Sequence, residues 1–258
     1  MTPVMQQFGE QQVAGFFLVL ARVSPLFVLA PLFSSQLMPA RVRGIVAVAL
    51  TIGLVPVVAR ERIPVETFQL AGLIGKELLV GLAFAFALGA LFAALSVAGT
   101  FLDTSIGFSF GSIVDPITGS SAAVLSQLYA LIGVLIFIAI GGDAWVMQGL
   151  ARTYDLVPLD QFPSLGSMTA GALKAFVGIF VAAIQVAGPV MLALILTDAA
   201  FGLVSRVVPQ LNVFAVGFAA KIVVGLLILG VTLPFLAGWL SEELEASVTE
   251  ALKMLRIA

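Results

Sequence analysis

The stretch LLVGLAFAFALGALFAALSVAGTFL, residues Leu78–Leu102, carries no charged side chain and decides the class of the fold. It is longer than the about 20 apolar residues that a membrane-spanning helix needs. Further charge-free runs lie on both sides of it, at Val23–Ala40, Gly44–Ala59, Pro116–Gly142, Ala175–Thr197 and Ile222–Ser241. The sequence therefore predicts an all-α integral membrane protein with about six hydrophobic helices, near residues 12–33, 42–59, 72–100, 122–142, 172–197 and 212–240.

The composition of the whole chain agrees with a membrane protein. Of its 258 residues 61% are apolar and 10% are charged, and the mean hydropathy is +1.17. A soluble domain has about 25% charged residues, so a cytosolic enzyme and a disordered chain are both excluded. Histidine and cysteine are absent, which excludes Ser/His/Asp triads, cysteine nucleophiles and the usual zinc and haem sites. We expect no enzyme, no cofactor, no metal and, from a net charge of −2, no nucleic-acid partner.

The second segment does not follow the rule for a simple span. Arg41 and Arg43 precede it, while Arg60 and Arg62 follow it, so the positive-inside rule draws both of its ends to the same side of the membrane. Prolines inside the apolar segments, at positions 25, 31, 56, 189 and 234, tend to kink helices. These features predict kinked helices that pack against protein as well as lipid.

Small residues recur every fourth position in the third segment, at Gly81, Ala85, Gly89 and Ala93. Such a stripe lets another helix backbone approach closely. The approaching helix belongs either to this chain or to another subunit, and we treat the stripe as a candidate subunit-packing site.

Charged residues in apolar surroundings need partners, because a charge at the centre of a membrane helix costs roughly 2.5–3.5 kcal/mol. Lys76 and Glu77 begin the third helix and Asp143 ends the fourth, so we expect them to mark membrane boundaries. Asp198 and Lys221 lie at similar distances from Pro209, and an antiparallel hairpin around that proline places them opposite each other. We predict a buried ion pair there, with mutual neutralisation or proton coupling as its role. Other charges within or beside the segments are Arg22, Asp103, Asp115 and Arg206.

Residues 107–121 (GFSFGSIVDPITGSS) break the pattern with glycines, serines, phenylalanines and an Asp-Pro step. The residue before proline disfavours helix, and non-helical backbone at membrane depth is tolerated only inside protein or along a cavity. The segment is therefore either an interfacial loop or a re-entrant, pore-lining loop. In the second case its apolar residues could close a pore.

The end of the chain, residues 241–258, has a different composition. Leu244, Val248, Leu252 and Leu255 repeat at helical spacing opposite several glutamates. This pattern predicts an amphipathic C-terminal helix lying on a membrane or protein surface.

Four strings, taken together in their order and spacing, resemble the FliR/SctT family of type III export-gate subunits. They are ARVSPLFVLAPLFSSQLMPARVR (Ala21–Arg43), GFSFGSIVDP (Gly107–Pro116), GGDAW (Gly141–Trp145) and LVSRVVPQLNVFAVGF (Leu203–Phe218). The resemblance covers essentially the whole chain, residues 1–258, as a single export-gate membrane domain.

The resemblance implies a non-enzymatic subunit of the flagellar protein export gate. Family members assemble as spirally packed helical hairpins with FliP-like and FliQ-like subunits and with FlhB, in the bacterial inner membrane at the flagellar basal body. The assembled core is raised toward the periplasmic side and passes unfolded flagellar proteins. The resemblance also places a gate or plug loop at residues 107–121, with the gate residues Phe108, Phe110, Ile113, Val114, Asp115 and Pro116.

A different function stays open from the residues alone. Broken helices are also typical of ion-coupled secondary transporters of small solutes. The charged residues Asp198 and Lys221 fit that alternative as well. Against that alternative stand the small number of segments and the absence of a visible inverted repeat. A purely structural membrane scaffold is a third possibility.

Overall fold

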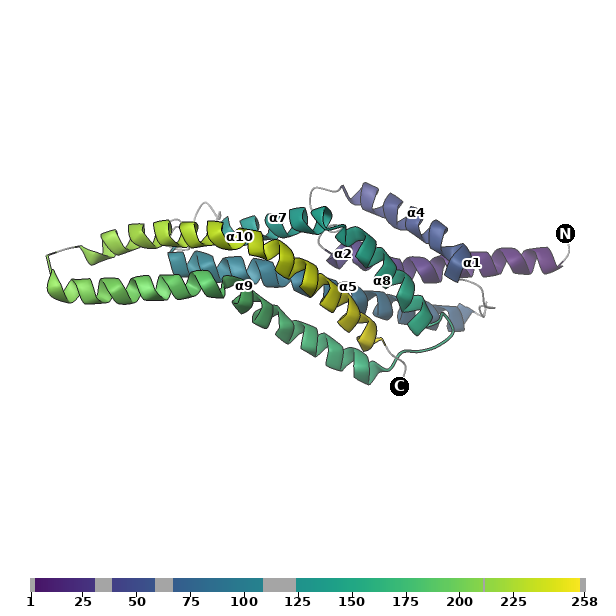
Figure 1. Cartoon of the computed structure of the whole chain (residues 1–258). Coiled ribbons are helices and arrows are strands. Elements are labelled where there is room, and N and C mark those ends of the chain that lie inside the picture. Colours follow the sequence, from purple (N-terminus) through teal and green to yellow (C-terminus); the bar gives the residue numbers. More distant parts are fainter. Residues whose placement is uncertain (1–2, 31–38, 59–66, 109–123, 211, 256–258) are drawn as a thin grey trace, which may run out of the picture. The chain divides into compact units, whose positions relative to one another are not determined.

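The computed structural model describes residues 3–30, 39–58, 67–108, 124–210 and 212–255, and these contain helices but no strand (Figure 1). The all-α prediction is therefore confirmed. The helices are α1 (Pro3–Val23), α2 (Leu26–Leu29), α4 (Ala40–Val58), α5 (Thr67–Ile106), α7 (Val124–Ala139), α8 (Gly142–Leu156), α9 (Leu165–Val207) and α10 (Val213–Met254).

Within the described ranges, five stretches of helix are long and apolar enough to cross a membrane, and a sixth exists if the bent pair α7 and α8 counts as one broken span. The predicted segments are all present, but three of them are much longer than predicted. Helices α5, α9 and α10 contain 40, 43 and 42 residues. Helix α8 was not predicted, because Asp143, Arg152 and Asp155 make its sequence too polar for a membrane segment.

The prolines act in two ways. Pro25 separates α1 from α2, and the Ser24 hydroxyl there donates to the Leu20 carbonyl, 2.5 Å away. Pro56, Pro189 and Pro234 instead lie inside α4, α9 and α10 without ending them. Each of these interior prolines removes one helical hydrogen bond.

The chain folds as two compact units, with one boundary inside each of the three long helices and a fourth between α7 and α8. Unit 1 comprises Met1–Ala90, Gly141–Phe176 and Leu244–Ala258, and unit 2 comprises Leu91–Ile140 and Val177–Glu243. Each unit has buried side chains of its own.

The core of unit 1 joins segments that are far apart in the sequence. Val80, Val157, Met168 and Leu255 form one buried cluster. Nearby, a Cβ placed on Gly149 would lie 2.9 Å from the Phe84 ring and 2.9 Å from a Val248 methyl group. A larger residue at 149 would therefore push α8 away from α5 and the end of α10.

The C-terminal amphipathic pattern is explained by this core. Residues 241–254 are not a separate helix but the last turns of α10. Leu244, Val248 and Leu255 are 1%, 6% and 0% exposed. The apolar face is therefore buried against this chain's own unit 1, which is the protein surface among the two predicted alternatives.

Unit 2 is built around the second half of α5. Leu95, Leu102 and Ile106 are fully buried there, and the Phe92 and Phe137 rings meet edge to face at 5.5 Å. Gly225 of α10 leaves room for Ile106, since a Cβ at that position would lie 2.7 Å from its side chain. Helices α5, α7, α9 and α10 all contribute to this core.

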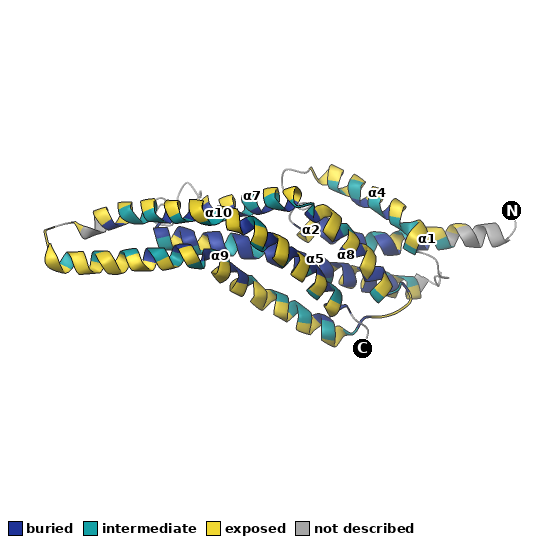
Figure 2. Ribbon diagram, viewed as in Figure 1, coloured by how far each residue is buried: buried dark blue, intermediate teal, exposed yellow. Residues whose placement is uncertain are grey.

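Much of the apolar surface stays uncovered. In the most apolar 18-residue stretch of α4 and in that of α10 only 11% is buried, and in that of α9 28% is buried (Figure 2). Large side chains such as Leu192, Leu227 and Phe235 are more than half exposed. Apolar surface on this scale suits lipid or other membrane subunits.

Candidate functional site

The predicted gate segment is described only at its start. Helix α5 ends at Ile106, Gly107 adopts a φ of 100°, and Phe108 is half-buried. Glycine takes a positive φ without strain, so it lets the chain leave the helix axis here. Phe110, Ile113, Val114, Asp115 and Pro116 lie outside the described residues.

A buried carboxylate joins the end of α5 to the start of α7. Asp103 of α5, 2% exposed, accepts hydrogen bonds from the Leu125 N–H at 3.0 Å and the Ser126 N–H at 3.1 Å. These are free N–H groups in the first turn of α7, where a negative charge also meets the positive end of the helix dipole. Asp103 thus caps α7 from the last turn of α5.

Two further contacts tighten this junction, which we call the Asp103 clamp. The Ser126 hydroxyl donates to the Ser96 carbonyl at 2.9 Å. A Cβ on Gly99 would lie 2.6 Å from the Leu125 carbonyl oxygen, so the close approach requires glycine. The end of α5 and the start of α7 are therefore held next to each other.

The second polar feature is a buried charge cluster in unit 1. The Arg22 guanidinium of α1 grips the Glu77 carboxylate of α5 with two donors: Nε to Oε2, and Nη2 to Oε1 at 2.9 Å. Neither side chain is exposed to solvent. A forked guanidinium–carboxylate pair is among the strongest polar contacts in proteins.

The same guanidinium also reaches the far end of α8. Its Nη2 donates to the Val157 carbonyl at 2.7 Å, and its Nη1 lies 3.4 Å from the Thr153 hydroxyl. The ring of Tyr154 lies below it, 4.1 Å from the guanidinium carbon, as a cation–π contact. Arg22 therefore ties α1 to both α5 and α8.

Lys76 adds a second cation to the cluster. Its ammonium lies 2.6 Å from the Glu77 carboxylate and donates to carbonyls of the loop that joins α8 to α9. Its side chain is 2% exposed. The prediction that Lys76 and Glu77 begin this helix is wrong, because α5 begins at Thr67. Both side chains are buried within protein, and their position at a membrane boundary stays a prediction. The sequence did hold a signal for the Arg22–Glu77 pair: the two residues carry opposite charges, and each lies in an apolar segment.

The small-residue stripe of α5 packs against α1 and α2. A Cβ on Gly81, one turn after Glu77, would overlap the Arg22 backbone, and one on Gly89 would lie 3.1 Å from the Leu29 carbonyl oxygen. Ala85 between them is fully buried. Gly81, Ala85 and Gly89 thus pack inside unit 1, the alternative to subunit packing, while Ala93 is half-buried in unit 2.

The hairpin of α9 and α10 brings Asp198 and Lys221 together, with 2.7 Å between the carboxylate and the ammonium. Their side chains are 55% and 24% exposed. The ion pair is thus present as predicted, but it is not buried within this chain. At the hairpin turn the Asn212 side chain accepts the Ala215 N–H at 3.3 Å and caps α10.

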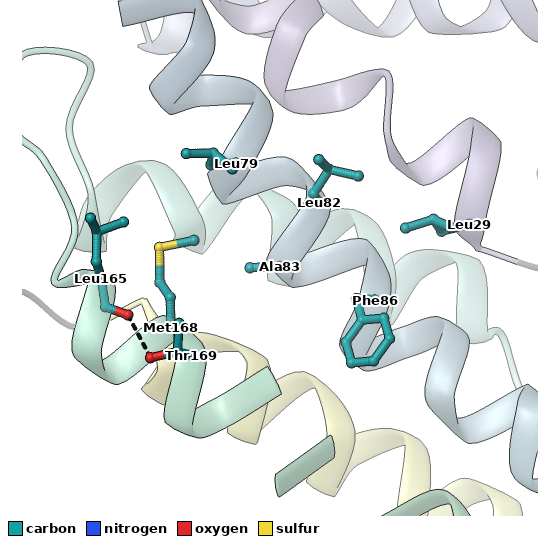
Figure 3. A pocket seen from close by; sticks show the side chains of 8 residues that line it. All are labelled: Leu29, Leu79, Leu82, Ala83, Phe86, Leu165, Met168 and Thr169. Carbon is teal, nitrogen blue, oxygen red and sulfur yellow. Dashed lines mark hydrogen bonds between the residues drawn. The ribbon is translucent and has the colours of Figure 1, made fainter. Parts of the chain in front are cut away.

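Unit 1 also carries an open apolar groove of about 350 Å³ between α2, α5 and α9 (Figure 3). Its single hydroxyl, on Thr169, bonds to the Leu165 carbonyl at 2.9 Å. The groove is therefore a hydrocarbon surface. It is lined by Leu29, Leu79, Leu82, Ala83, Phe86, Leu165, Met168 and Thr169.

The charge cluster and the Asp103 clamp hold helices together. Within the described ranges no three or more Asp and Glu side chains gather closely enough to hold a metal ion.

The sequence was compared with known proteins. Residues 13–247 match the family of bacterial export proteins, family 1. The flagellar biosynthetic protein FliR of Escherichia coli K12 is 29% identical over 237 residues, 91% of each chain. FliR of Bacillus subtilis is 32% identical over 222 residues, 83% of this chain and 84% of that protein. The surface presentation of antigens protein SpaR of Shigella flexneri is 26% identical over 82% of both chains. With its apolar helices and a match over nearly its whole length, the chain belongs to the bacterial export proteins, family 1.

Proposed function

We propose that this protein is a membrane-embedded subunit of the flagellar type III protein export apparatus. The observation that carries the proposal is the match to flagellar FliR proteins over more than four-fifths of both chains, on a chain with five or six apolar spans. SpaR of Shigella flexneri is 26% identical, less than the 29% and 32% of the two FliR proteins. This difference favours the flagellar branch over the surface-antigen branch.

The role that we assign is structural and conduit-forming, without catalysis of its own. The strongly buried charges of unit 1 are bonded to one another and to backbone carbonyls, and Asp198 is paired with Lys221. Nothing in these contacts favours the alternative of a stand-alone transporter.

The partners that we propose are FliP-like and FliQ-like subunits and FlhB, in the bacterial inner membrane with the core raised toward the periplasmic side. The support is the resemblance together with the uncovered apolar faces of α4, α9 and α10. Gly230 and Gly238 on the exposed side of α10 have open space where a Cβ would stand. Glycine weakens a helix, and a helix of another subunit could approach closely at both positions.

Affinity purification of the full chain in mild detergent tests the assembly. FliP-like and FliQ-like proteins should co-purify, and the chain reconstituted alone should transport nothing. Solute transport by the isolated chain would contradict the proposal and restore the transporter alternative.

Within this assembly we propose that residues 107–121 form the gate. The support is the resemblance and the Asp103 clamp, which holds the end of α5 beside the start of α7. Apolar side chains such as Phe108 and Phe110 are suited to closing a channel by excluding water.

Deletion of residues 108–114 tests the gate. The assembled export apparatus carrying the deletion should conduct ions in the resting state, measured as loss of membrane potential or as current in a bilayer. A complex that stays tight and exports normally would remove the gate assignment while leaving the proposed export function intact.

A further inference from the structure

The loop between α8 and α9 directs several backbone carbonyls at one ammonium group. The Nζ atom of Lys76 lies 3.1 Å from the Pro158 oxygen, 2.9 Å from the Leu159 oxygen and 3.1 Å from the Gln161 oxygen. The Glu77 carboxylate supplies a fourth oxygen at 2.6 Å. These four oxygens surround the nitrogen, and we call them the carbonyl cage.

The local backbone explains why the carbonyls converge. The Gln161 N–H donates to the Pro158 carbonyl at 3.2 Å, which closes a tight turn over residues 158–161. A turn of this kind brings successive carbonyls to one side of the chain. The preceding carbonyl, of Val157, is bound by Arg22 at 2.7 Å, so the loop is held by cations at two neighbouring points.

The geometry is that of an ion site more than of matched hydrogen bonds. An ammonium group has three N–H donors, while four oxygens surround this one, so at least one oxygen interacts with the charge alone. Proteins use groups of backbone carbonyls to replace the water shell of a monovalent cation. The Phe162 ring, 5.9 Å from Nζ, adds a cation–π contact.

The ammonium end of the cage is buried, while its outer rim is open, since Pro158 is half-buried and Gln161 is exposed. The Lys76 side chain is 2% exposed and that of Glu77 is not exposed at all, while Leu159 is 7% exposed. The buried carbonyl oxygen of Leu159 needs a donor or a positive charge beside it, and the Lys76 ammonium supplies both.

We propose that residues 158–161 and Glu77 form a site for a monovalent cation of ammonium size, and that the resident cation is the Lys76 ammonium itself. Lys76 is a positioning residue, since it fixes the connection between α8 and α9. Without this side chain the cage takes potassium, ammonium or methylammonium. The inference concerns the fold of this chain and does not depend on the export function.

Cation rescue of the purified full-length K76A variant tests the site. We expect K76A to lower the Tm in detergent by about 5–10 °C, as for a broken buried charge pair in a chain of this size. Methylammonium or potassium should restore at least half of the loss, and the bulkier tetramethylammonium should restore none. The matched control is K174A, which removes an exposed lysine paired with Glu250, and it should shift the Tm little and respond to no cation.

A K76A protein that is as stable as the parent, or whose loss no small cation restores, would overturn the proposal. Should K76A not accumulate, K76M serves in a second measurement, of loop opening, because its side chain fills most of the same volume. The chain has no cysteine, so Leu159→Cys provides a single buried thiol as reporter. Maleimide should label L159C at least ten times faster in the K76M background than in the parent, and equal rates would also overturn the proposal.

Discussion

Single residues decide how α1 meets α5. Gly81 lets the Arg22 backbone lie against α5, and one turn earlier Glu77 receives the guanidinium of the same arginine. The close approach and the ion pair therefore depend on each other: a larger residue at 81 would separate the helices, and the arginine would then lose its carboxylate.

Glu77→Gln tests the charge at the centre of this contact. It leaves Arg22 and Lys76 as two buried cations without a counter-charge, and we expect a loss of about 3–5 kcal/mol in unfolding free energy. The measurement is denaturant or thermal unfolding in detergent. Glu250→Gln, which breaks an exposed pair, should cost under about 1 kcal/mol; equal losses for both variants would show that burial of the Glu77 pair is unimportant.

Gly81→Ala tests the close approach. The new Cβ would overlap the Arg22 backbone, and relieving an overlap with backbone costs about 1–3 kcal/mol. Gly75→Ala on the same helix is the matched control, because its Cβ meets nothing within 4 Å and alanine stabilises a helix by about 1 kcal/mol. The two alanines should thus change the Tm in opposite directions, and a change of the same sign would contradict the packing argument.

At the scale of elements, α5 and α7 are joined by hydrogen bonds between a side chain of one helix and the backbone of the other. Asp103 satisfies two N–H groups of α7 that helix geometry leaves free. Inside a membrane protein no water is available to replace it, so the start of α7 depends on this carboxylate.

Asp103→Ala should fray the first turn of α7 and cost about 1–2 kcal/mol, the usual value for a lost helix cap. Hydrogen exchange should accelerate at the amides of Leu125 and Ser126 and leave the middle of α7 protected. Asp143→Ala, at an exposed site in the first turn of α8, should change exchange far less. Unchanged protection of Leu125 in the Asp103 variant would show that the clamp does not hold α7.

The apolar runs were enough to predict the helices, because a spanning helix needs only length and hydrophobicity. They could not predict α8, whose polar residues look like a loop, nor the true ends of α5, α9 and α10. Lys76 and Glu77 were misplaced at the start of a helix for a related reason: charge beside an apolar run indicates the end of a span on average, and only tertiary contacts reveal a buried partner such as Arg22. The Asp198–Lys221 contact followed from hairpin symmetry, but its exposure depends on neighbouring helices, which spacing does not determine.

At the scale of the whole molecule, each of the three long helices supplies side chains to both units. The last turns of α10 close the core of unit 1, where Val248 lies against α8 near Gly149. The end of the chain is therefore part of a core formed mainly by residues far earlier in the sequence.

Val248→Asp should destabilise unit 1 strongly, because it places an unpaired carboxylate at a position that is 6% exposed. Limited proteolysis should then cleave within residues 141–176 or 244–255 before it cleaves unit 2. Thr249→Asp, one residue further on at an exposed position, should leave the cleavage pattern unchanged. Simultaneous cleavage of both units would show that they unfold together.

The Asp103 clamp also has an evolutionary consequence. Since α5 and α7 are fastened to each other by their own residues, the helices do not rely on the chain between them for their placement. Lengthening a closed loop is inexpensive, at about 0.6 kcal/mol for each doubling. The scaffold of α5 and α7 can thus stay in place when the segment between the two helices changes in length.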